Sequence, residues 1–169
     1  APNELKRSHK MQRLKGVYIP CWTYDSDTHS TYTAEAGHYY YVTQTYMASE
    51  NGKMVRKTRQ VRKIRWRYTS GTYSRLFDDV LVNASKQIDR SLMPKLEPFE
   101  LDLLVKYKQE YLSGFFAERY SVDIKEGWSI ARSEIDNDIR SGIIRKINAD
   151  EVRNLRINSY YEDIKFKHI

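Results

Sequence analysis

The chain has 169 residues, of which 40% are hydrophobic and 30% are charged. That balance indicates one folded domain, and no stretch approaches the roughly 18 apolar residues of a membrane-spanning helix. The 29 Lys and Arg residues outnumber the 22 Asp and Glu residues, and a net charge of +7 favours anionic partners such as nucleic acid, acidic proteins or lipid headgroups. The single cysteine, Cys21, excludes an internal disulfide and a cysteine-based zinc site here, and fits a reducing, cytoplasmic location.

The first predicted elements are a short basic helix over residues 2–15 and a strand over residues 17–24. Asp25-Ser26-Asp27 is a segment of turn-forming residues. We therefore expect it to turn the chain into a second short strand at residues 29–34.

The clearest predicted unit is a long β-hairpin. Two β-type runs, residues 38–48 and 53–68, are joined through Glu50-Asn51-Gly52. Asn-Gly is the strongest local hairpin signal, because both residues tolerate the positive φ of a type I′ turn. A further strand is expected at residues 72–82, so that residues 17–83 form a meander-like antiparallel sheet of four or five strands.

The following part of the chain has the pattern of helices. Short helices are expected at residues 85–92 and 98–106, before a long amphipathic helix over residues 123–147. Asp123, with Glu126 three residues later, resembles a capping box at its start. Its apolar residues recur every three to four positions, which is more typical of a helix packed on a sheet than of a partner groove: Ile124, Trp128, Ala131, Ile135, Ile139, Ile143 and Ile147.

Together these elements predict an α+β fold in a single domain over residues 1–169. A twisted antiparallel sheet is packed by one long helix and shorter helices, with residues 85–157 mainly helical. A last strand is expected at residues 158–169. Since the chain begins without Met and stops within that strand, we expect it to be a fragment of a longer protein.

The sequence contains no familiar catalytic motif. It lacks the phosphate loop Gly-x-x-x-x-Gly-Lys-Ser/Thr, the dinucleotide turn Gly-x-Gly-x-x-Gly, the nucleophile elbow Gly-x-Ser-x-Gly and the zinc helix His-Glu-x-x-His. We therefore expect neither an enzyme nor a nucleotide-driven motor, and no cofactor.

The acidic and histidine residues give one weak metal candidate. Asp25, Asp27 and His29 are spaced by two, so on a strand all three would project from one face and could hold a divalent cation. The same segment is also consistent with an ordinary turn capped by Asp. Asp78 and Asp79 are adjacent and would face opposite ways on a strand, so they share a site only if a bulge intervenes.

One face of the predicted hairpin is basic and interleaved with tyrosines. In the register set by Asn51-Gly52, Tyr40 pairs with Lys63. The other face, with Tyr39, Tyr41, Ile64 and Trp66, is expected to join the core. On the basic face we predict that five cations contact the phosphates of DNA or RNA: Lys57, Arg59, Lys63, Arg65 and Arg67. We also predict that unpaired bases stack on Tyr40 and Tyr46. The alternative is a structural or protein-interaction scaffold, in which Lys and Arg stems only cover and solubilise the sheet.

Seven segments of the chain carry a resemblance to known sequences: Gly16–Asp25, Gly37–Thr43, Thr58–Trp66, Phe77–Val82, Leu96–Phe99, Gly114–Tyr120 and Asp163–His168. They resemble a family of uncharacterised bacterial zinc-ribbon proteins often labelled as relatives of primosomal protein N-prime, the replication restart helicase. The resemblance implies that this chain is the region after the zinc ribbon, and that the whole protein is linked to replication. It implies no helicase activity, because the motor motifs are missing, and it assigns no functional residue.

Overall fold

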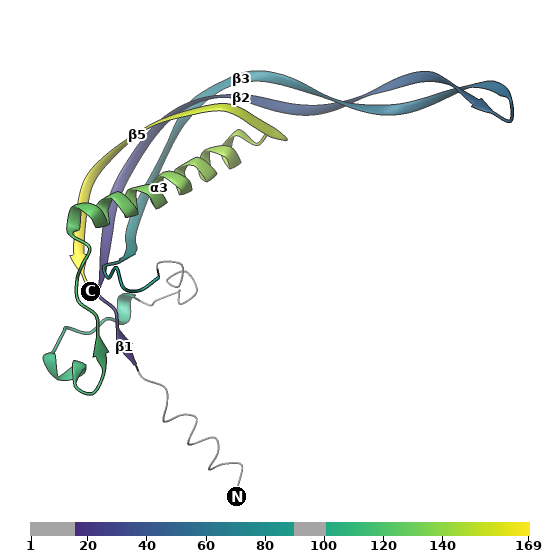
Figure 1. The fold of residues 1–169 in the computed structure, drawn as a ribbon. Coiled ribbons are helices and arrows are strands. Elements are labelled where there is room, and N and C mark those ends of the chain that lie inside the picture. Colours follow the sequence, from purple (N-terminus) through teal and green to yellow (C-terminus); the bar gives the residue numbers. More distant parts are fainter. Residues whose placement is uncertain (1–15, 90–100) are drawn as a thin grey trace, which may run out of the picture. The chain divides into compact units, whose positions relative to one another are not determined.

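The computed structural model describes residues 16–89 and 101–169, and strands predominate among them. The main sheet has three strands in the order β3-β2-β5. β2 (Cys21–Glu50) and β3 (Lys53–Asn83) form one long hairpin, and β5 (Glu151–His168) lies on the other side of β2 (Figure 1). The predicted mixture of an antiparallel sheet with helix is confirmed.

The remaining elements are shorter, apart from one helix. α3 (Ile124–Ile147) is the only α-helix in the part of the chain that the structure describes. β1 (Val17–Tyr18) and β4 (Phe116–Ala117) pair in parallel as a separate two-stranded sheet. Two short 3-10 helices cover Leu101–Leu103 and Gln109–Leu112. The predicted helix at residues 2–15 lies outside the described residues.

The described residues fall into two compact units. The first contains the chain up to Asp27, together with Leu76–Ile135 and Glu162–Ile169. The second contains Thr28–Arg75 and Asp136–Tyr161. Each unit therefore takes its strands and its part of α3 from segments that are far apart in the sequence.

One predicted turn and one predicted break between strands are wrong, because continuous strands run through them. Asp25-Ser26-Asp27 lies inside β2, where Ser26 is buried and its two neighbours are half-buried, as strand alternation requires. Gly71 lies inside β3, where a Cβ would come within 2.8 Å of the hydroxyl of Tyr32. This glycine makes room for a ring and does not mark a turn. The sheet accordingly has three long strands in place of a meander of four or five.

The hairpin turn is where the sequence predicts it, but several helix boundaries are not. Asn51 and Gly52 both have positive φ, 51° and 76°. Residues 85–89 and 104–106 are not helical, and the rest of the predicted 85–92 helix lies outside the described residues. β5 begins at Glu151, well before the predicted position 158, so residues 151–157 are strand where helix was expected.

α3 begins one residue after its predicted start and ends at the predicted residue. The Asp123 carboxylate accepts hydrogen bonds of 2.8 Å from the backbone N–H groups of Lys125 and Glu126, which caps the first turn. Asn148, with φ 50°, ends the helix in the left-handed conformation. The residues of α3 that are almost completely buried are Ala131, Ile135, Ile139 and Ile143.

In the first unit, the core forms where α3 meets β2 and β3. Tyr24, Val82 and Ala131 make the buried cluster. The Tyr24 hydroxyl donates to the carbonyl of Ile124 at 2.8 Å, and the Trp22 indole N–H donates to the carbonyl of Val122 at 2.9 Å. These bonds satisfy the polar ends of two large aromatic side chains inside the core.

In the second unit, α3 packs on a face of β2 that consists largely of small side chains. The buried residues of β2 alternate with less buried ones, which identifies the face that the helix covers: Thr28, Ser30, Tyr32, Ala34 and Ala36. Gly142 of α3 lies against the ring of Tyr73, and Lys146 donates to the carbonyl of Thr72 at 2.6 Å. Small residues and a glycine thus let helix and sheet approach closely.

Candidate nucleic-acid interface

The hairpin formed by residues 38–68, here called the hairpin arm, belongs wholly to the second unit. The contacts of β2 with the segment after α3 reach Tyr39, whose N–H donates to Asp150 at 2.7 Å and whose hydroxyl donates to Glu151. Beyond that point Figure 1 shows the arm continuing as a twisted ribbon of β2 and β3 alone. Since a strand rises about 3.3 Å per residue, the ribbon from Tyr40 to Glu50 is ~35 Å long.

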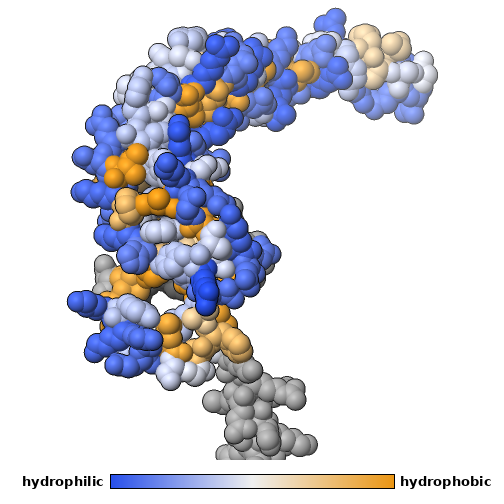
Figure 2. Space-filling view, turned by 60° about the vertical axis from the view of Figure 1, so that its left-hand side comes forward, coloured by the Kyte–Doolittle hydropathy of each residue, from blue (hydrophilic) through white to orange (hydrophobic). Residues whose placement is uncertain are grey.

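The hairpin arm contains the whole net charge of the chain. Residues 38–68 include eight Lys and Arg residues and one Glu, so the net charge of the arm is +7. The chain as a whole is also +7, so the other residues sum to zero. Figure 2 shows a mainly hydrophilic surface along the arm. Charge of one sign, concentrated on a narrow ribbon, produces a strong local field for an anionic partner.

The contacts across the arm fit the register in which Tyr40 faces Lys63. Arg59 donates two hydrogen bonds, of 3.0 and 2.8 Å, to the side-chain oxygen of Gln44, directly opposite. On the other face Gln60 donates to the hydroxyl of Thr43 at 3.2 Å. Even-numbered residues of β2 and odd-numbered residues of β3 therefore share one face, here called the basic face.

On the basic face the predicted tyrosines support predicted arginines. The Arg59 guanidinium lies 5.5 Å from the ring centre of Tyr46, and that of Arg65 lies 5.1 Å from the ring centre of Tyr40. The two tyrosines remain 40% and 37% exposed, respectively. A guanidinium over a ring is attracted to its π-face while its N–H groups still reach solvent.

The other predicted cations lie on the same basic face. Lys57 is half-buried and forms an ion pair of 2.7 Å with Glu50. Lys63 and Arg67 are exposed. The structure thus places all five predicted cations, with both tyrosines, on one face of the ribbon.

The opposite face of the arm is not the core that the sequence predicts. Tyr41 is 64% exposed. Tyr39 is covered by Arg62, with 4.3 Å from guanidinium carbon to ring centre, and Trp66 by Arg153 at 3.9 Å. Arginine side chains therefore cover these rings. The core lies on the other side because α3 packs against the even-numbered residues of β2.

Sequence reasoning missed Arg153, which lies far from the arm in the chain. It donates to Glu35 at 2.8 Å, and Asn154 donates to the same carboxylate at 2.6 Å. Those two bonds lower the pKa of Glu35 below its usual range. No local signal marks such a contact, because β5 brings these residues to β2 from more than a hundred positions away.

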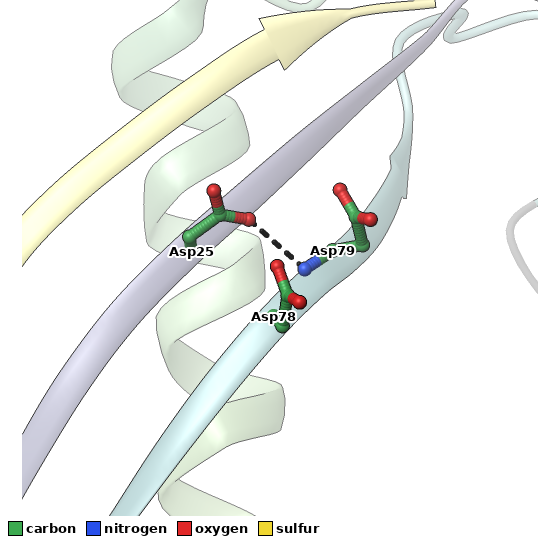
Figure 3. Close-up of side chains that lie close together, drawn as sticks. All are labelled: Asp25, Asp78 and Asp79. Atoms are coloured by element: carbon green, nitrogen blue, oxygen red, sulfur yellow. Dashed lines mark hydrogen bonds between the residues drawn. The ribbon is translucent and has the colours of Figure 1, made fainter. Parts of the chain in front are cut away.

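A cluster of three carboxylates lies in the first unit, with Asp25 on β2 and Asp78 and Asp79 on β3 (Figure 3). Their nearest oxygen atoms are all within 4.8 Å of one another. Asp25 accepts a hydrogen bond of 2.9 Å from the N–H of Asp79, and Lys167 lies 3.8 Å from the Asp79 carboxylate. Carboxylate oxygens are ligands for divalent cations, but here Asp25 and Asp79 already have partners within the chain.

A bulge in β3 brings the adjacent residues Asp78 and Asp79 together. His29 bonds to Ser74 in the hairpin register, at 2.9 Å. Just before β2, the carbonyl of Pro20 accepts from the N–H of Ala84, whereas the hairpin register would place residue 83 opposite Pro20. β3 thus contains one extra residue, and Asp79, with φ 53°, marks its place. Among the described residues, Asp27 and His29 are not members of a metal-type cluster.

Cys21 has the properties of an inert core residue. It is buried, and burial raises the pKa of its thiol to about 11. At neutral pH the thiol is therefore protonated and a poor nucleophile.

Comparison with known proteins adds one distant relative. No family model matches the chain, and no solved structure matches it. The chain is 23% identical over 168 residues to the uncharacterized protein YdjG of Bacillus subtilis (strain 168). The match covers 95% of this chain and 46% of that protein, so the chain spans about half the length of this relative. None of the helices in the described residues is long and apolar enough to cross a membrane.

Proposed function

We propose that this chain is a non-catalytic accessory domain that binds nucleic acid through the basic face of its hairpin arm. One observation carries the proposal: the arm contains the full +7 net charge of the chain. Nucleic acid is a dense linear polyanion, with about one charge per 1.7 Å of duplex. A basic ribbon that extends beyond its supporting helix offers cations along a line, which suits such a partner.

In this proposal the cations of the basic face contact phosphates. Arg59 and Arg65 are held by Tyr46 and Tyr40, so their N–H groups are oriented before the partner arrives. Lys63 and Arg67 are exposed beside them. Phosphate contacts carry no sequence information, so binding is largely independent of base sequence and sensitive to salt. The resemblance to zinc-ribbon proteins labelled as helicase relatives suggests a link to replication.

A second candidate is a scaffold that binds another protein. The observation that favours it is that several cations already have partners within the chain. Arg59 bonds to Gln44, Lys57 pairs with Glu50, and Arg62 covers Tyr39. Such contacts are expected when charged stems only solubilise an exposed sheet.

Fluorescence anisotropy with labelled single-stranded DNA, duplex DNA and RNA distinguishes the two candidates. With five phosphate contacts, the logarithm of the binding constant is expected to fall against the logarithm of salt concentration with a slope of about −4.5. The test variant reverses three charges on the basic face, Arg59→Glu, Lys63→Glu and Arg65→Glu. It is expected to bind at least about a hundredfold more weakly at low salt.

A matched control separates position from net charge. Lys106→Glu, Lys108→Glu and Arg119→Glu change the net charge by the same amount at exposed positions of the first unit. This control is expected to bind nearly as the unmodified chain does. If the two triple variants were equally weak, binding would depend on net charge alone. Absence of binding at low salt would exclude the nucleic-acid function and favour the scaffold.

A further inference from the structure

The tip of the hairpin arm contains two exposed methionines. Met47 precedes the turn on β2 and is 54% exposed, and Met54 follows the turn on β3 and is 64% exposed. In the hairpin register they are diagonal neighbours on the face opposite the basic face. Figure 2 shows hydrophobic colour at the far end of the arm, beyond a mainly hydrophilic stretch.

This apolar pair is exposed and lies next to cations, so it is not part of a core. Arg56 lies directly opposite Met47 in the register, and Lys53 directly precedes Met54 in the sequence. Two-stranded ribbons twist strongly, and Figure 1 shows β2 and β3 crossing over one another between the middle of the arm and its tip. Side chains from opposite faces can therefore meet the same partner at different positions along the ribbon.

We infer that the partner of the hairpin arm is a nucleic-acid double helix, and that Met47 and Met54 contact its bases while the basic face follows its phosphates. The inference rests on the proposed function and adds the class of nucleic acid and a role for the tip. The major groove of a duplex, about 12 Å wide, admits a two-stranded ribbon. Apolar side chains in that groove contact the methyl group of thymine at the base edges.

Two observations favour a duplex over other anionic partners. Single-strand binders offer free aromatic faces to bases, but Tyr40 and Tyr46 already have guanidinium groups over their rings. An anionic lipid surface reached by the tip would use only the cations near the turn. The cations here extend from Lys53 to Arg67, which suits a rod-like partner lying along the arm.

The experiment compares two tip variants of the full chain, both at exposed positions. Met47→Ser with Met54→Ser removes the apolar contact, and Met47→Leu with Met54→Leu keeps it. The serine variant is expected to bind labelled duplex DNA about tenfold more weakly at every salt concentration. Its salt slope should stay unchanged, because the phosphate contacts remain. The leucine variant should bind like the unmodified chain, and duplex should bind more tightly than single strands.

The outcomes separate this inference from the function on which it rests. If no nucleic acid binds at low salt, both fail. If the basic-face reversal abolishes duplex binding but the serine variant binds normally, the proposed function stands and the role of the tip fails. Tighter binding to single strands than to duplex overturns the inference as well. So does binding to phosphatidylserine vesicles that needs the methionines, if no duplex binds.

Discussion

At the scale of single residues, α3 and the sheet approach so closely that glycine is required on the helix. Gly127 is buried, and a Cβ there would collide with the hydroxyl of Tyr24 and lie 3.2 Å from Trp22. Moving the Tyr24 ring away would break the hydrogen bond that its hydroxyl donates to the carbonyl of Ile124. Burial and the negative charge of Asp123 raise the pKa of Tyr24 to about 12, so this donor is protonated at neutral pH.

We therefore expect Gly127→Ala to destabilise the fold, although alanine is the better helix former. Alanine gains about 1 kcal/mol of helix propensity, but forcing a methyl group into a packed site typically costs about 1–3 kcal/mol. Urea unfolding should show a net loss of stability on the order of 1 kcal/mol. Ser133→Ala, at an exposed position of α3, is the matched control and should be slightly stabilising.

The collision also predicts coupling between Gly127 and Tyr24. Tyr24→Phe removes the hydroxyl that the added methyl group would meet. The double variant should therefore be more stable than the sum of the two single changes implies. Additive losses, or a Gly127→Ala chain as stable as the unmodified one, would show that the helix has room to move.

At the scale of elements, the start of α3 depends on one carboxylate. Asp123 accepts N–H bonds from Glu126 and Lys125, and these bonds are the main cause of a pKa below its ordinary value of 3.8. Because the folded pKa is lower than the unfolded pKa, the charged form stabilises the fold above about pH 4. That contribution is lost as the pH falls through the folded pKa.

Asp123→Asn tests this cap, since an amide still accepts the N–H bonds but does not titrate. At neutral pH the melting temperature should fall by a few degrees, because the negative charge at the helix N-terminus is gone. Between neutral pH and pH ~3 the variant should lose less stability than the unmodified chain. Thermal melts by circular dichroism at several pH values measure both effects. Parallel curves for the two proteins would contradict a titrating cap at this position.

The elements that the sequence predicts well are those with a strong local cause. The hairpin turn follows from Asn51-Gly52, since both residues tolerate positive φ. α3 follows from its cap and from an apolar repeat whose middle members are buried: Ala131, Ile135, Ile139 and Ile143. Both depend on residues close together in the chain.

Strand length and the buried face of the arm could not be predicted, because distant contacts decide them. Asp25 and Gly71 are typical turn residues, yet one accepts a bond from the bulge at Asp79 and the other makes room for Tyr32. The aromatic face of the arm was expected to be core, but Arg153 covers Trp66. Alternation identifies two faces, and only the position of α3 determines which one is buried.

At the scale of the whole molecule, the net charge and the buried core lie in different parts of the chain. The hairpin arm holds the net charge, while the buried residues lie in β2 before the arm, near the end of β3 and in α3. Beyond Tyr39 the arm continues as a two-stranded ribbon, and such ribbons are only marginally stable by themselves. The stability of the fold should therefore depend little on residues 43–60, here called the outer arm.

Shortening the arm tests this separation. Deleting residues 43–50 and 53–60 leaves Val42-Asn51-Gly52-Val61, which keeps the turn, the register and the two faces. The deletion removes four Lys and Arg residues and one Glu, so the net charge falls from +7 to +4. The free energy of unfolding should change by less than about 1 kcal/mol. Duplex binding should weaken by at least about a hundredfold, because Arg59 and both tip methionines are lost.

The comparison of binding with stability makes the result decisive. A shortened chain that unfolds at the same urea concentration but no longer binds would make the outer arm a binding element that the fold does not need. If the shortened chain still binds duplex with the same salt slope, the interface lies at the remaining cations, such as Lys63 and Arg67. A large loss of stability would contradict the view that the outer arm lies outside the folding core, because its removal deletes few buried side chains.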